Sequence, residues 1–370
     1  MFVSSSFDSG NIEVVDLNEK EINLNIRKDN NFDFSQWFYF SFTGSKNKEY
    51  NFNISNAGKT SYPKGWENYN VCASYDRKNW FRVKSFFDGN ELKFSHKIER
   101  NTIYYSYFAP YTYERHLDLI SDAQESSLVE HSVLGKTIDE RNMDLLTVGN
   151  NNDNKKKIWL IARQHPGETM AEWFMEGFIK KLIDKNDPVS RELLNKAVFY
   201  LVPNMNPDGS FRGNLRTNTS GANLNREWGE PSVERSPEVF YVRNKIKEIG
   251  LDMFFDIHGD EGLPYNFFSR AEGIPSYDEK MEKRELEFTE TLIKINPDFQ
   301  DKFGYEKDKF GLANLTLAST YIGETYKTLS LTLEMPFKDN ANSPDEKYGW
   351  SPEKSIKLGE SFLSAILFNL

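Results

Sequence analysis

Short runs in which hydrophobic and polar residues partly alternate occupy the first 118 residues of the chain. They are rich in aromatic and β-branched side chains, and turn-forming residues such as Asp88-Gly89-Asn90 separate them. The runs cover residues 11–18, 21–27, 37–42, 50–55, 69–76, 80–87, 92–98 and 104–110. Because no helical period lies between them, the pattern predicts an antiparallel β-sandwich domain over residues 1–118.

Beyond residue 118 the pattern changes to longer apolar strands that alternate with amphipathic helices. The segment 114–133 is interpreted as a helix or a connector between the two regions. We predict strands at 156–164, 197–204, 252–259 and 329–337, and helices at 168–184, 236–250, 277–295 and 351–368. Such alternation predicts an α/β domain over residues 119–370, with helices on both faces of its sheet.

Polar residues follow each predicted strand of the α/β domain. Residues 163–168 come after the first strand and 204–209 after the second, while 256–260 end the third and Glu334 lies within the last. In open α/β sheets, ligands bind outside the carboxyl ends of the strands. These clusters therefore predict a functional site at that edge of the sheet.

Two histidines and a glutamate in these clusters have the character of metal ligands. His165 and Glu168 stand three residues apart at the start of a predicted helix, so their side chains project to one side. His258 would reach the same ion from another strand end, and two histidines with one carboxylate are typical of catalytic zinc. Taken alone, the first pair is more often an ordinary helix start. The polar residues at the matching strand ends favour the metal site.

Glu334 and a group of arginines add further candidate chemistry. A carboxylate within the apolar strand 329–337 is either a hydrogen-bonded core acid or a general base with a raised pKa. Arg212, Arg216 and Arg226 lie in a polar, turn-rich segment. Guanidinium groups bind carboxylates and stabilise oxyanions, although a single arginine in such a segment is usually solvated.

Composition narrows the class of protein. The net charge of −10 makes nucleic acid an unfavourable partner. The single cysteine, Cys72, excludes an internal disulfide and a cysteine-based metal cage. No stretch approaches the roughly 18 apolar residues of a membrane span, and the first residues lack the pattern of a signal peptide. We therefore expect a cytoplasmic protein without a membrane partner.

The order of the polar motifs identifies a family. The chain contains, in sequence, H-P-G-E, N-P-D-G, G-N-L-R, L-N-R-E-W, D-I-H-G and T-L-E-M-P-F. This order resembles that of zinc carboxypeptidases of the carboxypeptidase A superfamily, above all the cytosolic carboxypeptidase branch and its bacterial relatives. The resemblance covers essentially the whole chain. It implies an N-terminal antiparallel β-sandwich followed by a mixed-sheet α/β zinc carboxypeptidase domain.

The resemblance also implies a role for individual residues and one zinc ion per chain. Glu334 would be the general base, and Arg216 would polarise the scissile carbonyl and stabilise the oxyanion. Asn225 and Arg226 would bind the terminal carboxylate of the substrate. The zinc ligands implied by the match are His165, Glu168 and His258.

Some positions depart from the family pattern. Asn223 stands where an acid often lies two residues before the Asn-Arg pair, and Gly167 stands where carboxypeptidase A-type enzymes have arginine. Tyr321 and Tyr326 are candidates for the tyrosine that caps the substrate. The role of Asp256 is left open: it is either a partner of a ligand histidine or an ordinary acid at the end of a strand.

We therefore predict a zinc-dependent metallocarboxypeptidase that removes C-terminal residues from peptides or protein tails. An aspartoacylase-like amidohydrolase of small N-acyl amino acids is the alternative enzyme, and a non-catalytic module that binds carboxylated tails is the alternative from another class. The identity of the released residue is left open. Lys327 and Arg270 are the cations near the predicted pocket, and neither the oligomeric state nor the role of the sandwich follows from the sequence.

Overall fold

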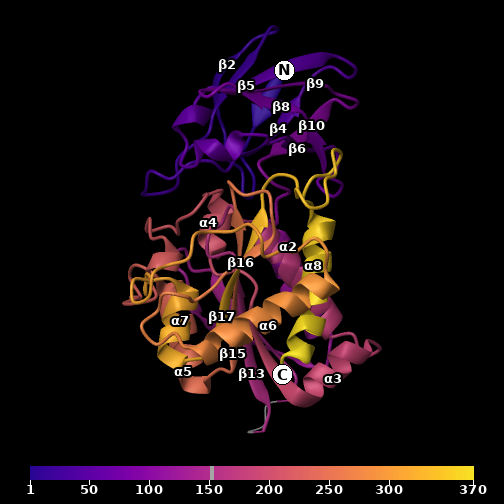
Figure 1. Cartoon of the computed structure of the whole chain (residues 1–370). Coiled ribbons are helices and arrows are strands. Elements are labelled where there is room, and N and C mark those ends of the chain that lie inside the picture. The colour runs from indigo at the N-terminus through magenta and orange to yellow at the C-terminus, as the bar shows by residue number, and fades with distance from the viewer. Residues whose placement is uncertain (151–153) are drawn as a thin grey trace.

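A computed structural model describes residues 1–150 and 154–370 and contains two regions stacked end to end (Figure 1). A β-sandwich built from the N-terminal part of the chain lies above a larger domain of helices and strands, with the C-terminus at the far end of the larger domain. The predicted fold class is thereby confirmed. The predicted domain boundary at residue 118 falls within helix α1 (Tyr113–Gln124) and stays a prediction.

The sandwich consists of two five-stranded sheets with the orders β1-β4-β10-β6-β7 and β2-β3-β5-β9-β8. All neighbouring strands are antiparallel except β3 and β5, which pair in parallel. The run 80–87, predicted as one strand, is divided into β7 and β8, which belong to different sheets. The strands are β1 (Phe2–Ser4), β2 (Glu13–Leu17), β3 (Ile22–Asn25), β4 (Tyr39–Thr43), β5 (Glu49–Ile54), β6 (Val71–Ser74), β7 (Phe81–Val83), β8 (Ser85–Phe87), β9 (Leu92–Lys97) and β10 (Thr102–Ser106).

The larger domain has a seven-stranded mixed sheet with the order β11-β12-β14-β13-β15-β17-β16. Its centre, from β14 to β17, is parallel, and the flanking strands pair antiparallel. The carboxyl ends of the parallel strands therefore meet at one edge. The strands are β11 (Val129–Lys136), β12 (Asn142–Val148), β13 (Lys156–Ala162), β14 (Ala197–Val202), β15 (Met253–Asp260), β16 (Phe267–Ser269) and β17 (Leu329–Pro336).

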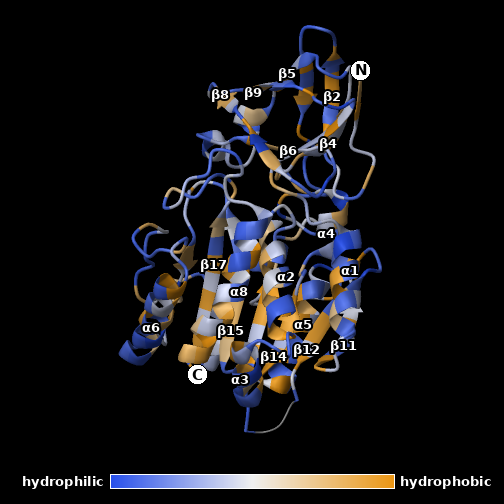
Figure 2. Cartoon of the chain, turned by 90° about the vertical axis from the view of Figure 1, so that its right-hand side faces the viewer, coloured by the Kyte–Doolittle hydropathy of each residue, from blue (hydrophilic) through white to orange (hydrophobic). Residues whose placement is uncertain are grey.

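Helices cover both faces of this sheet, as predicted. Strand β13 shows the reason: Ile158 and Leu160 belong to one hydrophobic core, whereas Trp159 and Ile161 belong to the other. Figure 2 shows α2 and α8 side by side on one face. The helices are α1 (Tyr113–Gln124), α2 (Met170–Leu182), α3 (Pro188–Lys196), α4 (Pro207–Arg212), α5 (Pro237–Ile249), α6 (Glu279–Ile295), α7 (Ala318–Tyr326) and α8 (Pro352–Phe368), with single 3-10 turns at Ala57–Lys59, Pro63–Trp66 and Leu224–Arg226.

The sequence pattern missed several short or exposed elements. Strand β11 begins inside the segment interpreted as helix or connector, and most of its residues are at least partly exposed. An edge strand of this kind lacks the apolar alternation that marks a half-buried strand. Its partner β12 and the helices α3, α4 and α7 were not predicted either.

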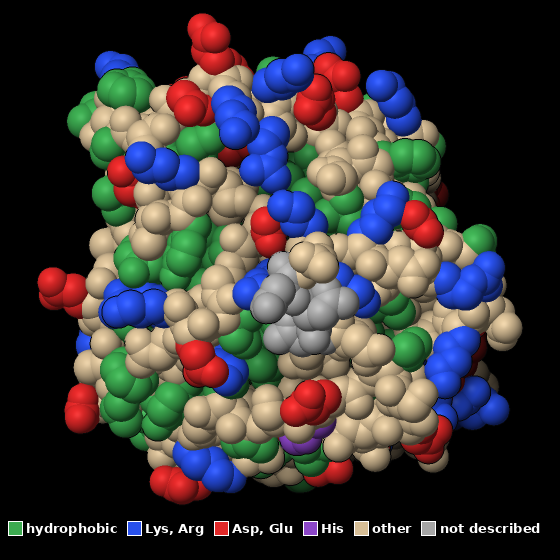
Figure 3. Space-filling model, turned by 90° about the horizontal axis from the view of Figure 1, so that it is seen from below, with side chains coloured by type: hydrophobic (Ala, Val, Ile, Leu, Met, Phe, Trp, Pro, Cys, Tyr) green, Lys and Arg blue, Asp and Glu red, His purple; other side chains and the backbone are tan. Residues whose placement is uncertain are grey.

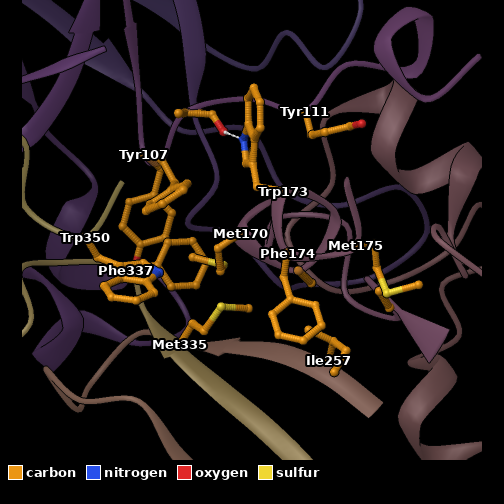
Figure 4. Packing of buried hydrophobic residues seen from close by; sticks show 14 of the residues in the cluster. Tyr107, Tyr111, Met170, Trp173, Phe174, Met175, Ile257, Met335, Phe337 and Trp350 are labelled. Atoms are coloured by element: carbon orange, nitrogen blue, oxygen red, sulfur yellow. Dashed lines mark hydrogen bonds between the residues drawn. The ribbon is translucent and has the colours of Figure 1, made fainter. Parts of the chain in front are cut away.

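The two regions share one hydrophobic core. Tyr107, just after the last sandwich strand, stacks on Phe337 at a ring-centroid distance of 4.3 Å (Figure 4). Trp173 of α2 donates its ring N–H to the Ala109 carbonyl oxygen at 3.0 Å. Arg82 of β7 donates to the carbonyl oxygens of Phe337 and Trp350. The sandwich is therefore packed directly against the larger domain and is not joined to it by the chain alone.

The surface at the opposite end carries Lys and Arg side chains interspersed with Asp and Glu (Figure 3). The chain contains many residues of both charge signs and has a net charge of −10. A surface of mixed charge is therefore the ordinary hydrated surface that this composition predicts. Among the described helices, none combines the length and the apolar character needed to cross a membrane.

Candidate metal centre and active site

The carboxyl ends of the parallel strands bring the predicted site residues together. His165 follows β13, while His258 lies in β15 directly opposite Glu334 of β17 in the strand register. Glu168 lies two residues before Met170, the first residue of α2. The apolar cores of these strands hold the edge in place, because their residues are buried on both faces.

His165, Glu168 and His258 form a compact cluster whose ligand atoms all lie within 4.8 Å of one another. The Glu168 carboxylate bridges the two rings: one oxygen lies 2.6 Å from His165 Nδ1, and the other lies 2.7 Å from His258 Nδ1. All three side chains are buried, with exposed fractions of 3% or less. Two imidazole nitrogens and a carboxylate that converge in this way are a donor set that suits zinc.

The far ring nitrogen of each histidine is held by a second residue. His165 Nε2 lies 3.0 Å from the side-chain oxygen of Asn223, and His258 Nε2 lies 2.8 Å from an Asp256 carboxylate oxygen. When Nε2 carries the proton and donates to such an acceptor, the lone pair of Nδ1 is free for a metal. Asn223 and Asp256 therefore each support one of the two histidines.

The electrostatics of the cluster differ from residue to residue: burial lowers the pKa of His258, but the Asp256 and Glu168 carboxylates outweigh it and raise that pKa well above its ordinary value. Burial, together with the nearby Arg216 charge, lowers the pKa of His165 to about 3, so its ring is neutral. Burial raises the pKa of the Glu334 carboxyl well above its ordinary value, and the Glu168 carboxylate adds to this effect. One Glu334 oxygen is buried without a hydrogen-bond partner among the described residues. Such an atom is poised to hold a proton or to accept one from a bound molecule.

A strained loop presents the first two ligands. Arg163 has a φ of +60°, in the left-handed region that is unusual for residues other than glycine. Its buried guanidinium donates to the carbonyl oxygens of Pro166 and Tyr111 and contacts Glu172 at 2.7 Å. These contacts hold the loop that carries His165 and fix its conformation.

Gly167 is explained by the close approach of the neighbouring segment. A Cβ atom at this position would lie 3.0 Å from the backbone oxygen of Leu215, to which the Gly167 N–H donates at 2.8 Å. A longer side chain such as arginine would have to displace Leu215. The departure from the carboxypeptidase A pattern is therefore built into the packing of this site.

Arg216, Asn225 and Arg226 line the same pocket as the histidines and Glu334. Asn225 and Arg226 lie on the 3-10 turn Leu224–Arg226, where the Asn225 side-chain oxygen accepts from the Ala318 N–H at 2.8 Å. That bond leaves the NH2 group of Asn225 as the donor toward a ligand. The pocket has a volume of about 330 Å³, and its lining includes Glu261, Ser269, Arg270, Tyr305, Thr320 and Thr332.

The sequence did not single out all the residues of this pocket. Tyr305 lines it, and its hydroxyl donates to Asp260 at 2.6 Å, whereas Tyr321 packs against Trp228 in a core away from the site. Lys327 is exposed at the end of α7, but Arg270 reaches the pocket while it contacts Asp301 at 2.6 Å. The segment that contains Tyr305 has no regular structure, so no periodic pattern marks it.

Comparisons with known proteins agree with this arrangement. Residues 113–356 match the family model for zinc carboxypeptidases, and the chain therefore belongs to the zinc carboxypeptidase family. Residues 3–108 match the model for the cytosolic carboxypeptidase N-terminal domain, which places the chain beside the cytosolic carboxypeptidases. It is a metallocarboxypeptidase with one zinc ion, as predicted, and neither the amidohydrolase nor the binding-module alternative is favoured.

Similar proteins include a metallo-carboxypeptidase from Burkholderia cenocepacia, with 49% identity and a TM-score of 0.98 over 100% of this chain and 98% of that one. A metallo-carboxypeptidase from Pseudomonas aeruginosa, solved in complex with (2-guanidinoethylmercapto)succinic acid, has 44% identity and a TM-score of 0.97 over 100% and 98% of the two chains. Cytosolic carboxypeptidase 6 from Caenorhabditis elegans is 28% identical, covering 98% of this chain and 86% of the relative.

Proposed function

We propose that the pocket hydrolyses the last peptide bond of peptides or protein tails, with zinc held by His165, Glu168 and His258. The observation that carries this proposal is the convergence of three buried ligands, three arginines and a buried Glu334 oxygen that has no hydrogen-bond partner among the described residues, all in one pocket. Zinc in such a site supplies Lewis-acid chemistry, because it polarises a carbonyl group and makes water more acidic.

Glu334 is proposed as the general base. Its pKa is raised, and one of its oxygens has no hydrogen-bond partner in the part of the chain that the structure describes. Both features suit a group that takes a proton from water and returns it to the leaving amine. Arg216 is proposed to donate to the carbonyl oxygen as negative charge develops there, which lowers the barrier most in a site that excludes water.

Asn225 and Arg226 are proposed to bind the C-terminal carboxylate of the substrate. The Asn225 amide and the Arg226 guanidinium both offer N–H donors at the pocket, and Arg226 is also tied to the Asn225 carbonyl oxygen at 2.6 Å. An internal peptide bond has no carboxylate to place there. This accounts for cleavage at the end of a chain only.

The test combines metal analysis with a panel of N-acetylated tripeptides that end in each of the twenty amino acids. We expect about one zinc per chain and release of single C-terminal residues. Glu334→Gln should keep the zinc and lower kcat at least about a thousandfold, whereas the exposed control Glu192→Gln should leave both unchanged. Cleavage by Glu334→Gln at the unmodified rate would overturn the role of Glu334.

The same panel tests the role of Arg226 and identifies the released residue. Tripeptides with an amidated C-terminus should not be cleaved, and Arg226→Ala should lose discrimination against them. Arg270 is the cation that reaches the pocket from outside the Arg216–Arg226 segment, so peptides that end in glutamate, arginine and leucine are compared directly. Equal cleavage of the free and amidated peptides would contradict the proposal that Asn225 and Arg226 bind the C-terminal carboxylate.

We further propose a cytoplasmic location and substrates that are peptides or proteins rather than nucleic acids. Relatives named cytosolic carboxypeptidases and the net charge of −10 support these two points. Fractionation of cells that express the chain, followed by immunodetection in the cytoplasmic fraction, tests the location. Recovery in the membrane or extracellular fraction would contradict it.

A further inference from the structure

The segment that carries Arg216 is held by the sandwich. Helix α4 lies at the top of the larger domain, directly below the sandwich (Figure 1), and the chain after it contacts residues 11–31. Arg27 donates to the Arg212 carbonyl oxygen at 2.7 Å, and Asn11 donates to that of Gly213 at 2.7 Å. Asn31 donates to the Thr219 carbonyl oxygen at 2.8 Å. The sandwich therefore contacts this segment on both sides of Arg216.

Asp29 lies at the centre of these contacts. One oxygen of its carboxylate accepts from the Leu215 N–H at 2.6 Å. The other oxygen accepts from the Arg216 N–H at 2.8 Å, the Thr217 N–H at 2.9 Å and the Thr217 hydroxyl at 3.0 Å. Three successive backbone donors are thus fixed by one carboxylate that comes from a residue nearly two hundred positions away.

The burial of Asp29 is exceptional within the sandwich. Among residues 1–108, all of which the structure describes, Asp29 is the one buried residue with a charged side chain, with an exposed fraction of 5%. A buried carboxylate is costly unless hydrogen bonds compensate for the lost water. Here all four hydrogen bonds come from the segment Leu215–Thr217, so the compensation comes entirely from the other domain.

The sandwich also contacts the side chain of Arg216. The guanidinium lies 5.5 Å from the ring centre of Tyr62 and 5.6 Å from that of Phe34, within the range of cation–π contacts. With the backbone fixed by Asp29 and the guanidinium flanked by two rings, few orientations remain for this side chain. One of these orientations faces the pocket that contains the histidines.

We infer that Asp29 is a positioning residue for Arg216, so that the sandwich completes the active site of the adjacent domain. This inference rests on the role proposed above for Arg216. Asp29 itself does not line the pocket. It acts by holding the backbone of Leu215–Thr217, from which the guanidinium is directed toward the reacting carbonyl group.

The test uses the full-length, zinc-loaded chain and the best-cleaved tripeptide of the panel. Asp29→Asn keeps the shape of the side chain but replaces one accepting oxygen by a donor. It should lower kcat about tenfold to a hundredfold with KM little changed, because transition-state contacts depend on position more steeply than ground-state binding does. The matched control is Asp33→Asn, the same change at an exposed aspartate four positions away, which should leave kcat unchanged.

A double-mutant comparison separates positioning from general damage. Arg216→Ala alone should lower kcat about a hundredfold or more, and adding Asp29→Asn should then have no further effect. An equal loss in both backgrounds would overturn the inference, as would a change in KM alone. If Asp29→Asn does not fold, Thr217→Val removes one of the four donors and should lower kcat by a smaller factor; an unchanged kcat in that variant would overturn the inference.

Hydrogen exchange provides a readout that does not depend on catalysis. The amide hydrogens of residues 215–217 should exchange faster in Asp29→Asn than in Asp33→Asn, because their acceptor is weakened. If the unmodified chain cleaves no tripeptide, the proposed function is contradicted. The exchange measurement would still decide whether Asp29 holds the backbone of Leu215–Thr217. Equal exchange in the two variants would overturn the role of Asp29.

Discussion

The two regions of the molecule bury different kinds of side chains. The sandwich core is built from aromatic rings such as Phe40, Phe52 and Tyr105, and Asp29 is its one buried charged residue. The larger domain buries many ionisable groups besides those of its site, among them His116, Asp144, Arg163, Glu172 and Glu238. Burial of charge is costly, and these groups are compensated by polar partners in their own domain: Glu172 contacts His116 and Arg163, and Glu238 accepts from Asn218. The sandwich differs, since its single buried charge is compensated by donors of the other domain.

Glu172→Gln should have the largest effect on stability. Glu172 contacts His116 at 2.6 Å and Arg163 at 2.7 Å. The amide would therefore leave buried Arg163 without its carboxylate partner and His116 with Asp144 alone. We expect the free energy of unfolding to fall by about 3–5 kcal/mol, measured by urea denaturation with circular dichroism. The exposed control Glu192→Gln should leave it unchanged. Equal stability of both variants would show that buried charge in this domain is not stabilised by pairing.

The second largest effect should be the change in the free energy of unfolding with pH that comes from His116. Burial alone lowers the pKa of His116, but the Glu172 and Asp144 carboxylates raise it to about 9, above the ordinary value of 6.5. The contribution of this group is therefore complete below pH 6.5 and is lost as the pH rises toward 9. The free energy of unfolding should fall by about 2–3 kcal/mol over that interval.

The matched control for this pH profile is His116→Gln. Glu238 and Glu285 have pKa values raised by burial to about 8 and about 7, and they make stability fall with pH in the same direction. The difference between the two profiles isolates His116. Parallel profiles would contradict a protonated His116 in the folded protein.

Phe52→Leu should weaken the sandwich by a smaller amount. Phe52 is 1% exposed and stacks on Phe94 at 4.7 Å, with Phe42 and Tyr105 close by. Leucine keeps much of the apolar volume, so we expect a loss of about 1–2 kcal/mol in the free energy of unfolding, without dependence on pH. A loss larger than that of Glu172→Gln would reverse the comparison between the two cores.

Asn223→Ala should produce the smallest of these effects, which is a decrease in the affinity for zinc. The variant removes the acceptor of His165 Nε2 and should weaken zinc binding about tenfold in competition with a chelator, or about 1.4 kcal/mol. Asn223→Asp should bind zinc more tightly, because a carboxylate is the stronger acceptor. Asn186→Ala, in an exposed turn, serves as the control. Equal zinc affinity of all these variants would show that Asn223 does not support the ligand.

The sequence predicted the parts of the fold that have a strong apolar pattern. Strands β14 and β17 are buried throughout and β13 is buried from Ile158 on, and each was predicted from a run of apolar residues. The edge strand β11 contains Glu130, His131 and Ser132, and its polar character concealed it. Helix α7 follows a turn-rich stretch and has no charged residue in its first turn to mark its start.

For the site, short contiguous motifs could be predicted and long-range contacts could not. His165, Glu168 and His258 lie in strand-end motifs, and the structure brings them together. Tyr305 reaches the pocket from an irregular segment, and Asp29 meets Leu215 across 186 positions of sequence. Nothing in the residues around Asp29 distinguishes it from the exposed Asp33, because only the folded contact gives it a role.

The hydrogen bonds between Asp29 and Leu215–Thr217 also have a consequence for synthesis on the ribosome. The sandwich strands are complete once Ser106 has been made, yet the donors that satisfy Asp29 are at Leu215–Thr217. At roughly 5–20 residues per second, translating the 111 residues from position 107 to position 217 takes about 6–22 s. During that interval the nascent N-terminal region carries a carboxylate that has to remain hydrated, so its final docking waits for the chain that will carry Arg216.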